Sequence, residues 1–141
     1  MKSAAKLMIF DQNGYLFAGK AKKDGRLEML GGKIDRGEDP KRSLLRELSE
    51  ELNGESLLDH VRQSSVEPVR VQAGEQADFV FKIEVDQIDL SVLVQKGDET
   101  TALVIINRPT VERADQLVRN KKLFTGRTWK LFQAMGYLST D

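Results

Sequence analysis

Three glutamates lie close together in the sequence, at Glu47, Glu50 and Glu51. Residues three and four positions apart share one face of an α-helix, so the three carboxylates would project together. Like charges at this spacing destabilise a helix, and neither Glu47 nor Glu51 has a Lys or Arg one turn away. Hard carboxylate oxygens are the ligands that Mg²⁺ and Mn²⁺ prefer. The spacing therefore favours a divalent-metal site over a merely solvated acidic face.

A helix over Pro40–Leu52 is predicted to carry these carboxylates. Asp39 can cap the helix, and Pro40 suits its first turn because a missing N–H is no loss there. Asn53-Gly54 is predicted to end it, since both residues tolerate the left-handed conformation. An apolar stripe at helical spacing consists of Leu44, Leu45, Leu48 and Leu52. The helix would thus bury its leucines and present the glutamates at the edge of the buried surface.

A glycine-rich loop precedes this helix. Gly31 and Gly32 would let the backbone come close to the helix, where a carbonyl could join a metal shell. The alternative is a tight turn with no ligand role. Glu38 and Arg46 form a natural charge pair that would hold the loop and orient a neighbouring glutamate. Their other interpretation is a plain surface ion pair, which contributes little.

The rest of the chain predicts a β-rich segment, a helix, a second β-rich segment and further helices. This order indicates an α/β (α+β) sandwich with a mixed sheet, in one domain over residues 1–141. The expected strands are Ala4–Phe10, Tyr15–Gly19, Leu27–Leu30, Val66–Val71, Asp78–Val85, Leu90–Val94 and Ala102–Asn107. The expected later helices are Thr110–Val118 and Arg127–Met135.

Composition excludes several classes of protein. The 141 residues contain no cysteine, which removes disulfides, zinc–thiolate sites and a cysteine nucleophile. The single histidine, His60, argues against a histidine-rich metal site and is expected at the surface or at a helix cap. A formal net charge of zero predicts no bulk attraction to DNA. Without a membrane-length apolar run or a signal-like N-terminus, we expect a cytoplasmic protein with no membrane partner.

At this point a family resemblance is clear. The sequence contains Gly32, then five residues and Glu38, then seven residues and Arg46-Glu47-Leu48-Ser49-Glu50-Glu51. This pattern resembles the Nudix box of the Nudix hydrolase superfamily. The pattern departs where the family has Gly and an aliphatic residue, since Asn53 and Gly54 stand there. The resemblance implies a Nudix α/β/α sandwich with a mixed sheet and a loop–helix–loop box.

The resemblance also implies a reaction, hydrolysis of the diphosphate linkage in a nucleoside diphosphate joined to another group. It implies Mg²⁺ or Mn²⁺ as cofactor, with Glu47, Glu50 and Glu51 as catalytic metal ligands and the Gly31 carbonyl as a further ligand. Glu38 and Arg46 would support them.

Many family members add an acidic residue from a downstream loop as an extra ligand or base. Glu99 is favoured here as that catalytic residue, with Asp98, Glu75 and Asp78 as alternatives.

The start of the box indicates the class of substrate. The segment from Gly31 to Asp35 is similar to the start of the box in MutT-like nucleoside triphosphate pyrophosphohydrolases, with Lys33 as a contact for substrate phosphate. We therefore expect a small-molecule nucleotide of (d)NTP type. The alternatives are an ADP-ribose or nucleotide-sugar pyrophosphatase and a non-catalytic nucleotide-sensing Nudix domain. A homodimer is left open.

Aromatic residues allow two interpretations. Phe79 and Phe81 alternate on one predicted strand and therefore share a face, which indicates core packing or a base-stacking platform. Trp129, Phe132 and Met135 are expected in the core.

Overall fold

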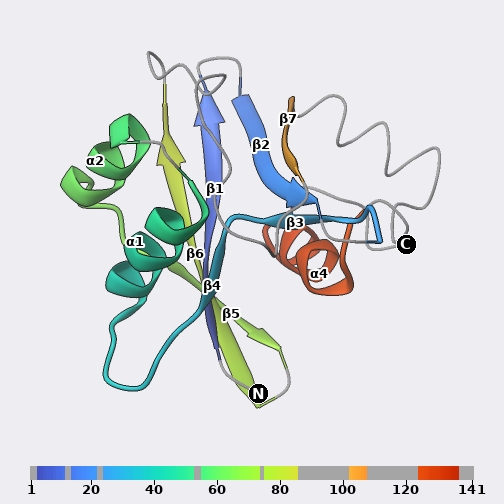
Figure 1. The fold of residues 1–141 in the computed structure, drawn as a ribbon. Coiled ribbons are helices and arrows are strands. Elements are labelled where there is room, and N and C mark those ends of the chain that lie inside the picture. Colours follow the sequence, from blue (N-terminus) through green and yellow to red (C-terminus); the bar gives the residue numbers. More distant parts are fainter. Residues whose placement is uncertain are drawn as a thin grey trace.

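The computed structural model describes residues 3–11, 14–21, 24–52, 55–73, 75–85, 102–107 and 124–136. The expected strand Leu90–Val94, the expected helix Thr110–Val118 and the candidate residues Asp98 and Glu99 lie outside these ranges. The described strands are β1 (Ala4–Asp11), β2 (Gly14–Ala21), β3 (Leu27–Met29), β4 (Gly31–Lys33), β5 (Val69–Ala73), β6 (Gln76–Glu84) and β7 (Ala102–Asn107). The described helices are α1 (Pro40–Glu51), α2 (Glu55–Gln63) and α4 (Gly126–Ala134) (Figure 1).

A mixed sheet organises these elements, as the sequence predicted. Its strand order is β3-β2-β1-β6-β5, with β4 paired to β1 and β7 paired to β2. β1 and β6 are parallel, with Leu7 opposite Phe81, whereas β2 and β4 both run antiparallel to β1. β1 is therefore the strand from which the sheet extends in both directions.

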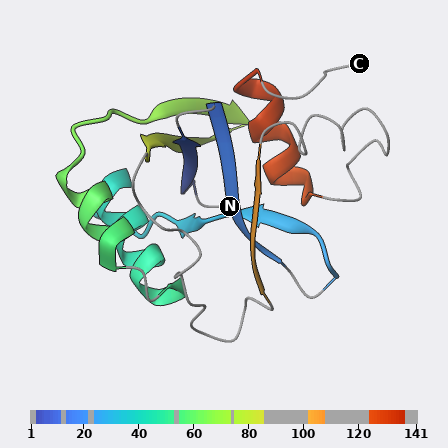
Figure 2. The same cartoon turned by 90° about the horizontal axis from the view of Figure 1, so that it is seen from above.

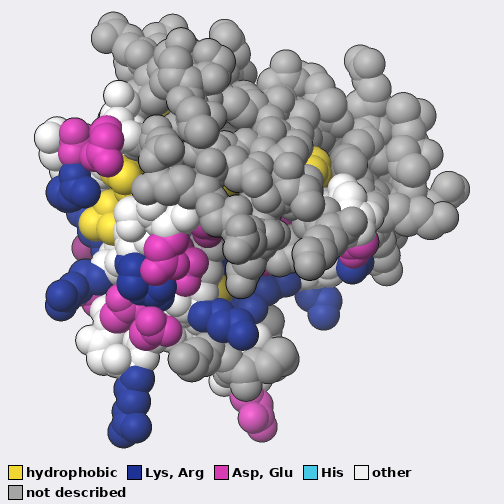
Figure 3. Space-filling view, in the orientation of Figure 1, with side chains coloured by type: hydrophobic (Ala, Val, Ile, Leu, Met, Phe, Trp, Pro, Cys, Tyr) yellow, Lys and Arg dark blue, Asp and Glu magenta, His cyan; other side chains and the backbone are white. Residues whose placement is uncertain are grey.

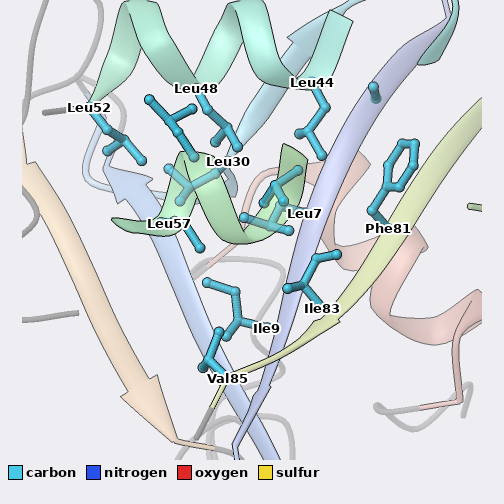
Figure 4. Packing of buried hydrophobic residues seen from close by; sticks show 13 residues of the cluster. Leu7, Ile9, Leu30, Leu44, Leu48, Leu52, Leu57, Phe81, Ile83 and Val85 are labelled. Carbon is cyan, nitrogen blue, oxygen red and sulfur yellow. The ribbon is translucent and has the colours of Figure 1, made fainter. Parts of the chain in front are cut away.

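Helices cover both faces of this sheet, which gives the three-layer α/β/α sandwich (Figure 2). On one face, α1 and α2 pack over a buried cluster that includes Leu7 and Phe81 (Figure 4). On the other face, α4 covers a second cluster that contains Trp129 and Phe132, with Met135 packed against it. The core interpretation is confirmed for Phe81, Trp129 and Phe132.

Helix α1 forms much as its sequence predicts. The Asp39 side chain accepts a hydrogen bond from the backbone N–H of Arg42 at 2.8 Å, and Pro40 occupies the first turn. Leu44 and Leu48 are fully buried one turn apart. The helix ends at an extended Leu52, whose N–H donates to the Leu48 carbonyl at 2.9 Å. The anchored leucine face fixes the direction in which the adjacent flank with the glutamates points.

Two elements were not predicted from the sequence. The first is α2, whose buried residues Leu57, Leu58 and Val61 pack against the same cluster as α1. His60 lies within it, half-buried, with Nε2 at 2.7 Å from the Glu84 carbonyl oxygen at the end of β6. The second is β4, because the glycine-rich segment was expected to be a loop but its start pairs with β1.

The strand boundaries also shift slightly. The strand expected at Val66–Val71 is found at Val69–Ala73, and the one expected at Asp78–Val85 begins at Gln76. Among the described helices, none is long and apolar enough to cross a membrane.

Candidate functional site

A charge pair between Glu38 and Arg46 joins the loop before α1 to the helix. Arg46 Nε donates to Glu38 Oε2 at 2.9 Å and Arg46 Nη2 donates to Oε1 at 3.0 Å, so the pair is bidentate. Glu38 Oε1 also accepts from Ser43 Oγ at 2.8 Å and from the Asp35 backbone N–H at 3.0 Å. The hydrogen bonds from Arg46, followed by that from Ser43, lower the pKa of Glu38 to about 2. Glu38 therefore stays ionised at neutral pH and holds the loop against α1.

The same guanidinium reaches two of the three candidate metal ligands. Arg46 Nη1 lies 3.0 Å from Glu47 Oε1 and 3.4 Å from Glu50 Oε1. Nη2 also donates to the Lys33 carbonyl oxygen at 3.0 Å and lies 3.3 Å from Asp35 Oδ2. Figure 3 shows basic and acidic side chains interleaved on this surface of α1. One cation is thus shared among carboxylates from the loop and the helix.

The hydrogen bonds to Glu38, and next those to Glu47, raise the pKa of the Arg46 guanidinium above its ordinary value. Arg46 consequently remains a cation throughout the working range of pH.

The adjacent glycines Gly31 and Gly32 are each required for a different structural reason. Gly31 has φ of +120°, and a Cβ there would lie 2.1 Å from the Ala5 carbonyl oxygen, because β4 passes close to β1 at this point. A Cβ at Gly32 would lie 2.3 Å from Glu47 Cδ and 2.5 and 2.7 Å from its two carboxylate oxygens. Gly31 is therefore required by the sheet, whereas Gly32 makes room for the Glu47 carboxylate against the backbone of β4.

The three candidate ligands differ in exposure along their shared face of α1. Glu51 is only 8% exposed and both of its carboxylate oxygens are buried, whereas the Glu50 side chain is 58% exposed. Glu47 lies between these extremes, at 19%. A cation is attracted more strongly in partly buried surroundings than in bulk water, so this gradient suits an ion held at the protein surface.

The chemistry of this donor set fits a divalent metal. Three carboxylates beside a close-packed glycine backbone supply the hard oxygen ligands of Mg²⁺ or Mn²⁺. Within the described residues, however, no three Asp, Glu or His side chains are arranged to hold one ion. Glu47 and Glu50 are turned toward Arg46 instead.

The remaining candidates are dispersed. The Lys33 side chain is exposed beside the loop, and Gly31 lies in β4 opposite Lys6. Glu75 is exposed in the turn between β5 and β6.

Asp78 has a different environment, facing α4. Its buried carboxylate accepts from the Ala4 N–H at 3.0 Å and forms an ion pair with Arg127. This pair raises the pKa of Arg127 and anchors α4 to the sheet. The structure thus does not bring Asp78 to the glutamates of α1.

Ser43 and Asp35 were missed by sequence reasoning, although both contact the Glu38–Arg46 pair. A serine inside the leucine face of the predicted helix was the available signal for Ser43. The signal for Asp35 was its position three residues before Glu38, where a turn brings the two together.

Comparison with known proteins is decisive for the family. The NUDIX domain pattern matches residues 2–128 of the chain. The chain belongs to the Nudix hydrolase family. Nudix hydrolases are pyrophosphohydrolases, and they generally use divalent metals and act on nucleotide-type small molecules. No curated protein matches it in sequence.

Solved structures with the same fold are distant in sequence. A NUDIX family hydrolase from Clostridium perfringens has 16% identity and a TM-score of 0.58, with 98% of each chain covered. The Escherichia coli dihydroneopterin triphosphate pyrophosphohydrolase has 13% identity and a TM-score of 0.60, over 94% of this chain and 91% of that one.

A third is a bifunctional NMN adenylyltransferase/ADP ribose pyrophosphatase from Francisella tularensis, complexed with AMP and a Mn ion. It has 12% identity and a TM-score of 0.66 over 95% of this Nudix chain. The chain spans 40% of that protein's length. At these identities the likeness shows the fold alone.

Proposed function

We propose that this Nudix hydrolase cleaves the diphosphate linkage of a (d)NTP-type nucleotide, with Glu47, Glu50 and Glu51 holding Mg²⁺ or Mn²⁺. The observation that carries the proposal is the placement of these three carboxylates on one face of α1, with Glu47 against the glycine backbone of β4. The Gly31 carbonyl is proposed as a further ligand from the same strand.

Each residue around the glutamates has a distinct task in this proposal. When bound, the ion neutralises charge on phosphate oxygens and makes water more acidic. Arg46 and Glu38 fix the loop relative to α1, so that the ligands on both elements keep one geometry. The exposed ammonium of Lys33, at the start of this loop, is available to pair with a substrate phosphate.

The reaction adds water across a P–O–P bond. A new P–O bond forms to the water oxygen, the anhydride P–O bond breaks, and one proton leaves the attacking water. We propose Glu99 as the group that assists by accepting this proton, with Asp98 and Glu75 as alternatives. Asp78 is not retained, because it is buried in its pair with Arg127.

The test is a turnover screen with Mg²⁺ or Mn²⁺ and a panel of canonical and oxidised (d)NTPs, ADP-ribose, other nucleotide sugars and dinucleoside polyphosphates. Glu51→Gln keeps the shape of the buried side chain but removes its charge, and is expected to lower turnover by about 100-fold or more. Glu67→Gln, at an exposed position outside α1, is the matched control and should retain activity.

Each outcome has a defined meaning. Release of pyrophosphate and a nucleoside monophosphate, lost in Glu51→Gln, supports the proposal. AMP released from ADP-ribose instead would move the protein to the ADP-ribose branch. Metal binding with no turnover on any substrate would favour a nucleotide-sensing domain, and full turnover by Glu51→Gln would refute the assigned metal site.

A further inference from the structure

We infer that Arg46 competes with the divalent ion for Glu47 and Glu50, and that Glu38 limits this competition by holding the other edge of the guanidinium. This inference rests on the proposed function, since it assigns Glu47 and Glu50 as metal ligands. It makes Arg46 a positioning residue that relieves the repulsion between these two carboxylates and must give up part of its contacts when an ion binds.

The division of contacts within one guanidinium supports this inference. Nε and Nη2 are committed to Glu38, at 2.9 and 3.0 Å, and Nη2 also donates to the Lys33 carbonyl oxygen. Nη1 alone faces the candidate metal ligands, at 3.0 Å from Glu47 and 3.4 Å from Glu50. Nε and Nη2 of Arg46 therefore bind the loop, and Nη1 contacts the carboxylates of α1.

Electrostatics explains why Nη1 lies near both Glu47 and Glu50. Glu47 and Glu50 are three residues apart on α1, where like charges repel. A cation between them relieves that repulsion, and Arg46 supplies it. As long as both carboxylates are turned to Nη1, the described acidic side chains do not converge on one point. The arrangement that relieves the repulsion between Glu47 and Glu50 is thus not an arrangement that holds an ion.

Binding of an ion would make the contacts between Nη1 and these carboxylates less favourable. An ion that takes carboxylate oxygens of Glu47 and Glu50 removes acceptors from Nη1 and adds positive charge beside it. The contact with Glu50 is the longer one, and its side chain is the most exposed of the three ligands, so we expect this contact to be lost first. The bidentate pair with Glu38 involves other atoms and should remain.

Two substitutions separate competition from simple support. Arg46→Gln removes the competing cation, so Mn²⁺ affinity should rise by about three- to tenfold, as expected for one nearby charge partly screened by salt. Glu38→Gln frees the guanidinium to pair more closely with Glu47 and Glu50, so Mn²⁺ affinity should fall. If Arg46 and Glu38 were only a structural brace, both substitutions would weaken binding together.

The measurement is the Mn²⁺ affinity of each purified protein by titration calorimetry, with thermal unfolding to verify folding. Arg42→Gln is the matched control, because it removes one positive charge from an exposed position on the same helix, one turn away. Its affinity should stay within about twofold of the wild type. Weaker Mn²⁺ binding in both Arg46→Gln and Glu38→Gln would overturn the inference and leave the proposed function standing.

A second measurement needs no weakened variant. The wild-type protein is titrated with Mg²⁺ and followed by nitrogen-15 NMR spectra of its arginine side chains. The Arg46 Nη signals should change, whereas the Nε–H signal should show that its hydrogen bond is kept. Arg46→Lys serves only to assign these signals. Unchanged Arg46 signals at saturating Mg²⁺ would refute the competition. No binding of either ion by the wild type would refute the proposed metal site itself, and the inference with it.

Discussion

Replacing Gly32 by alanine would place a methyl group in the volume now occupied by the Glu47 carboxylate. The new Cβ would lie 2.3 Å from Glu47 Cδ, whereas ordinary contacts between such atoms are at about 3.5 Å. The carboxylate must therefore move by roughly 1 Å, which is feasible because it is the end of a flexible side chain. A displacement of this size in a positioning group costs on the order of 100-fold in rate.

The neighbouring substitution Gly31→Ala should instead lower the stability of the fold. Its Cβ would lie 2.1 Å from the backbone oxygen of Ala5, and its φ of +120° strains any residue with a side chain. Backbone strain and overpacking together cost about 2–6 kcal/mol, a large part of the stability of a domain this size. We expect a fall in Tm of roughly 10 °C or more.

The assay combines thermal unfolding with steady-state turnover of whichever substrate the screen identifies. Gly32→Ala should unfold within a few degrees of the wild type and yet lose kcat. Gly25→Ala is the control for a positive φ, since its φ is +85° and a Cβ there meets no atom within 4 Å. It should lower Tm slightly and keep kcat. Wild-type kcat in a folded Gly32→Ala protein would refute the argument that Glu47 must lie against β4.

Three further predictions concern charge. The folded-state pKa of Glu38, about 2, is below its ordinary value of 4.5, so its contribution to stability is complete above pH 4.5 and is lost as pH falls toward 2. The Tm difference between the wild type and Glu38→Gln should therefore shrink over that range. Asp78→Asn breaks the ion pair between the buried Asp78 and the partly exposed Arg127, and should lower the free energy of unfolding by roughly 2–3 kcal/mol, or Tm by about 5–10 °C, while kcat stays within about twofold of the wild type. A loss of kcat in the folded variant would return Asp78 to the candidate bases. Mg²⁺ at about 100 times its dissociation constant should stabilise the wild type by about 2.7 kcal/mol, and EDTA should reverse the resulting rise in Tm, whereas a Tm insensitive to Mg²⁺ would argue against a metal site in the folded state.

Local signals made helix α1 predictable. Asp39 and Pro40 specify its start, and the leucine spacing specifies the face that it buries. Once that face is fixed, the positions of the glutamates follow from helix geometry. Helix α2 has a similar apolar spacing, but Asn53-Gly54 directly before it is a pattern that ends helices, so the sequence did not predict a helix there.

Contacts between distant parts of the chain could not be predicted in the same way. Gly31 and Gly32 resemble a loop in sequence, and only their pairing with β1 makes them a strand. The pair between Asp78 and Arg127 joins residues far apart in sequence, and neither position differs from a surface charge until the sheet is assembled. The turning of Glu47 and Glu50 toward Arg46 likewise depends on side-chain conformations that spacing does not determine.

The parallel pairing of β1 with β6 has a consequence for how the chain folds during synthesis. β1 is the strand to which β4 and the loop before α1 are attached, yet six of its residues pair with β6, beginning with Ala5 opposite Phe79. Contacts of such long sequence separation form slowly, and a growing chain cannot form them until β6 has left the ribosome. Until then, α1 has only part of the sheet on which to bury its leucines, so the carboxylate face becomes fixed only after well over half of the chain has been made.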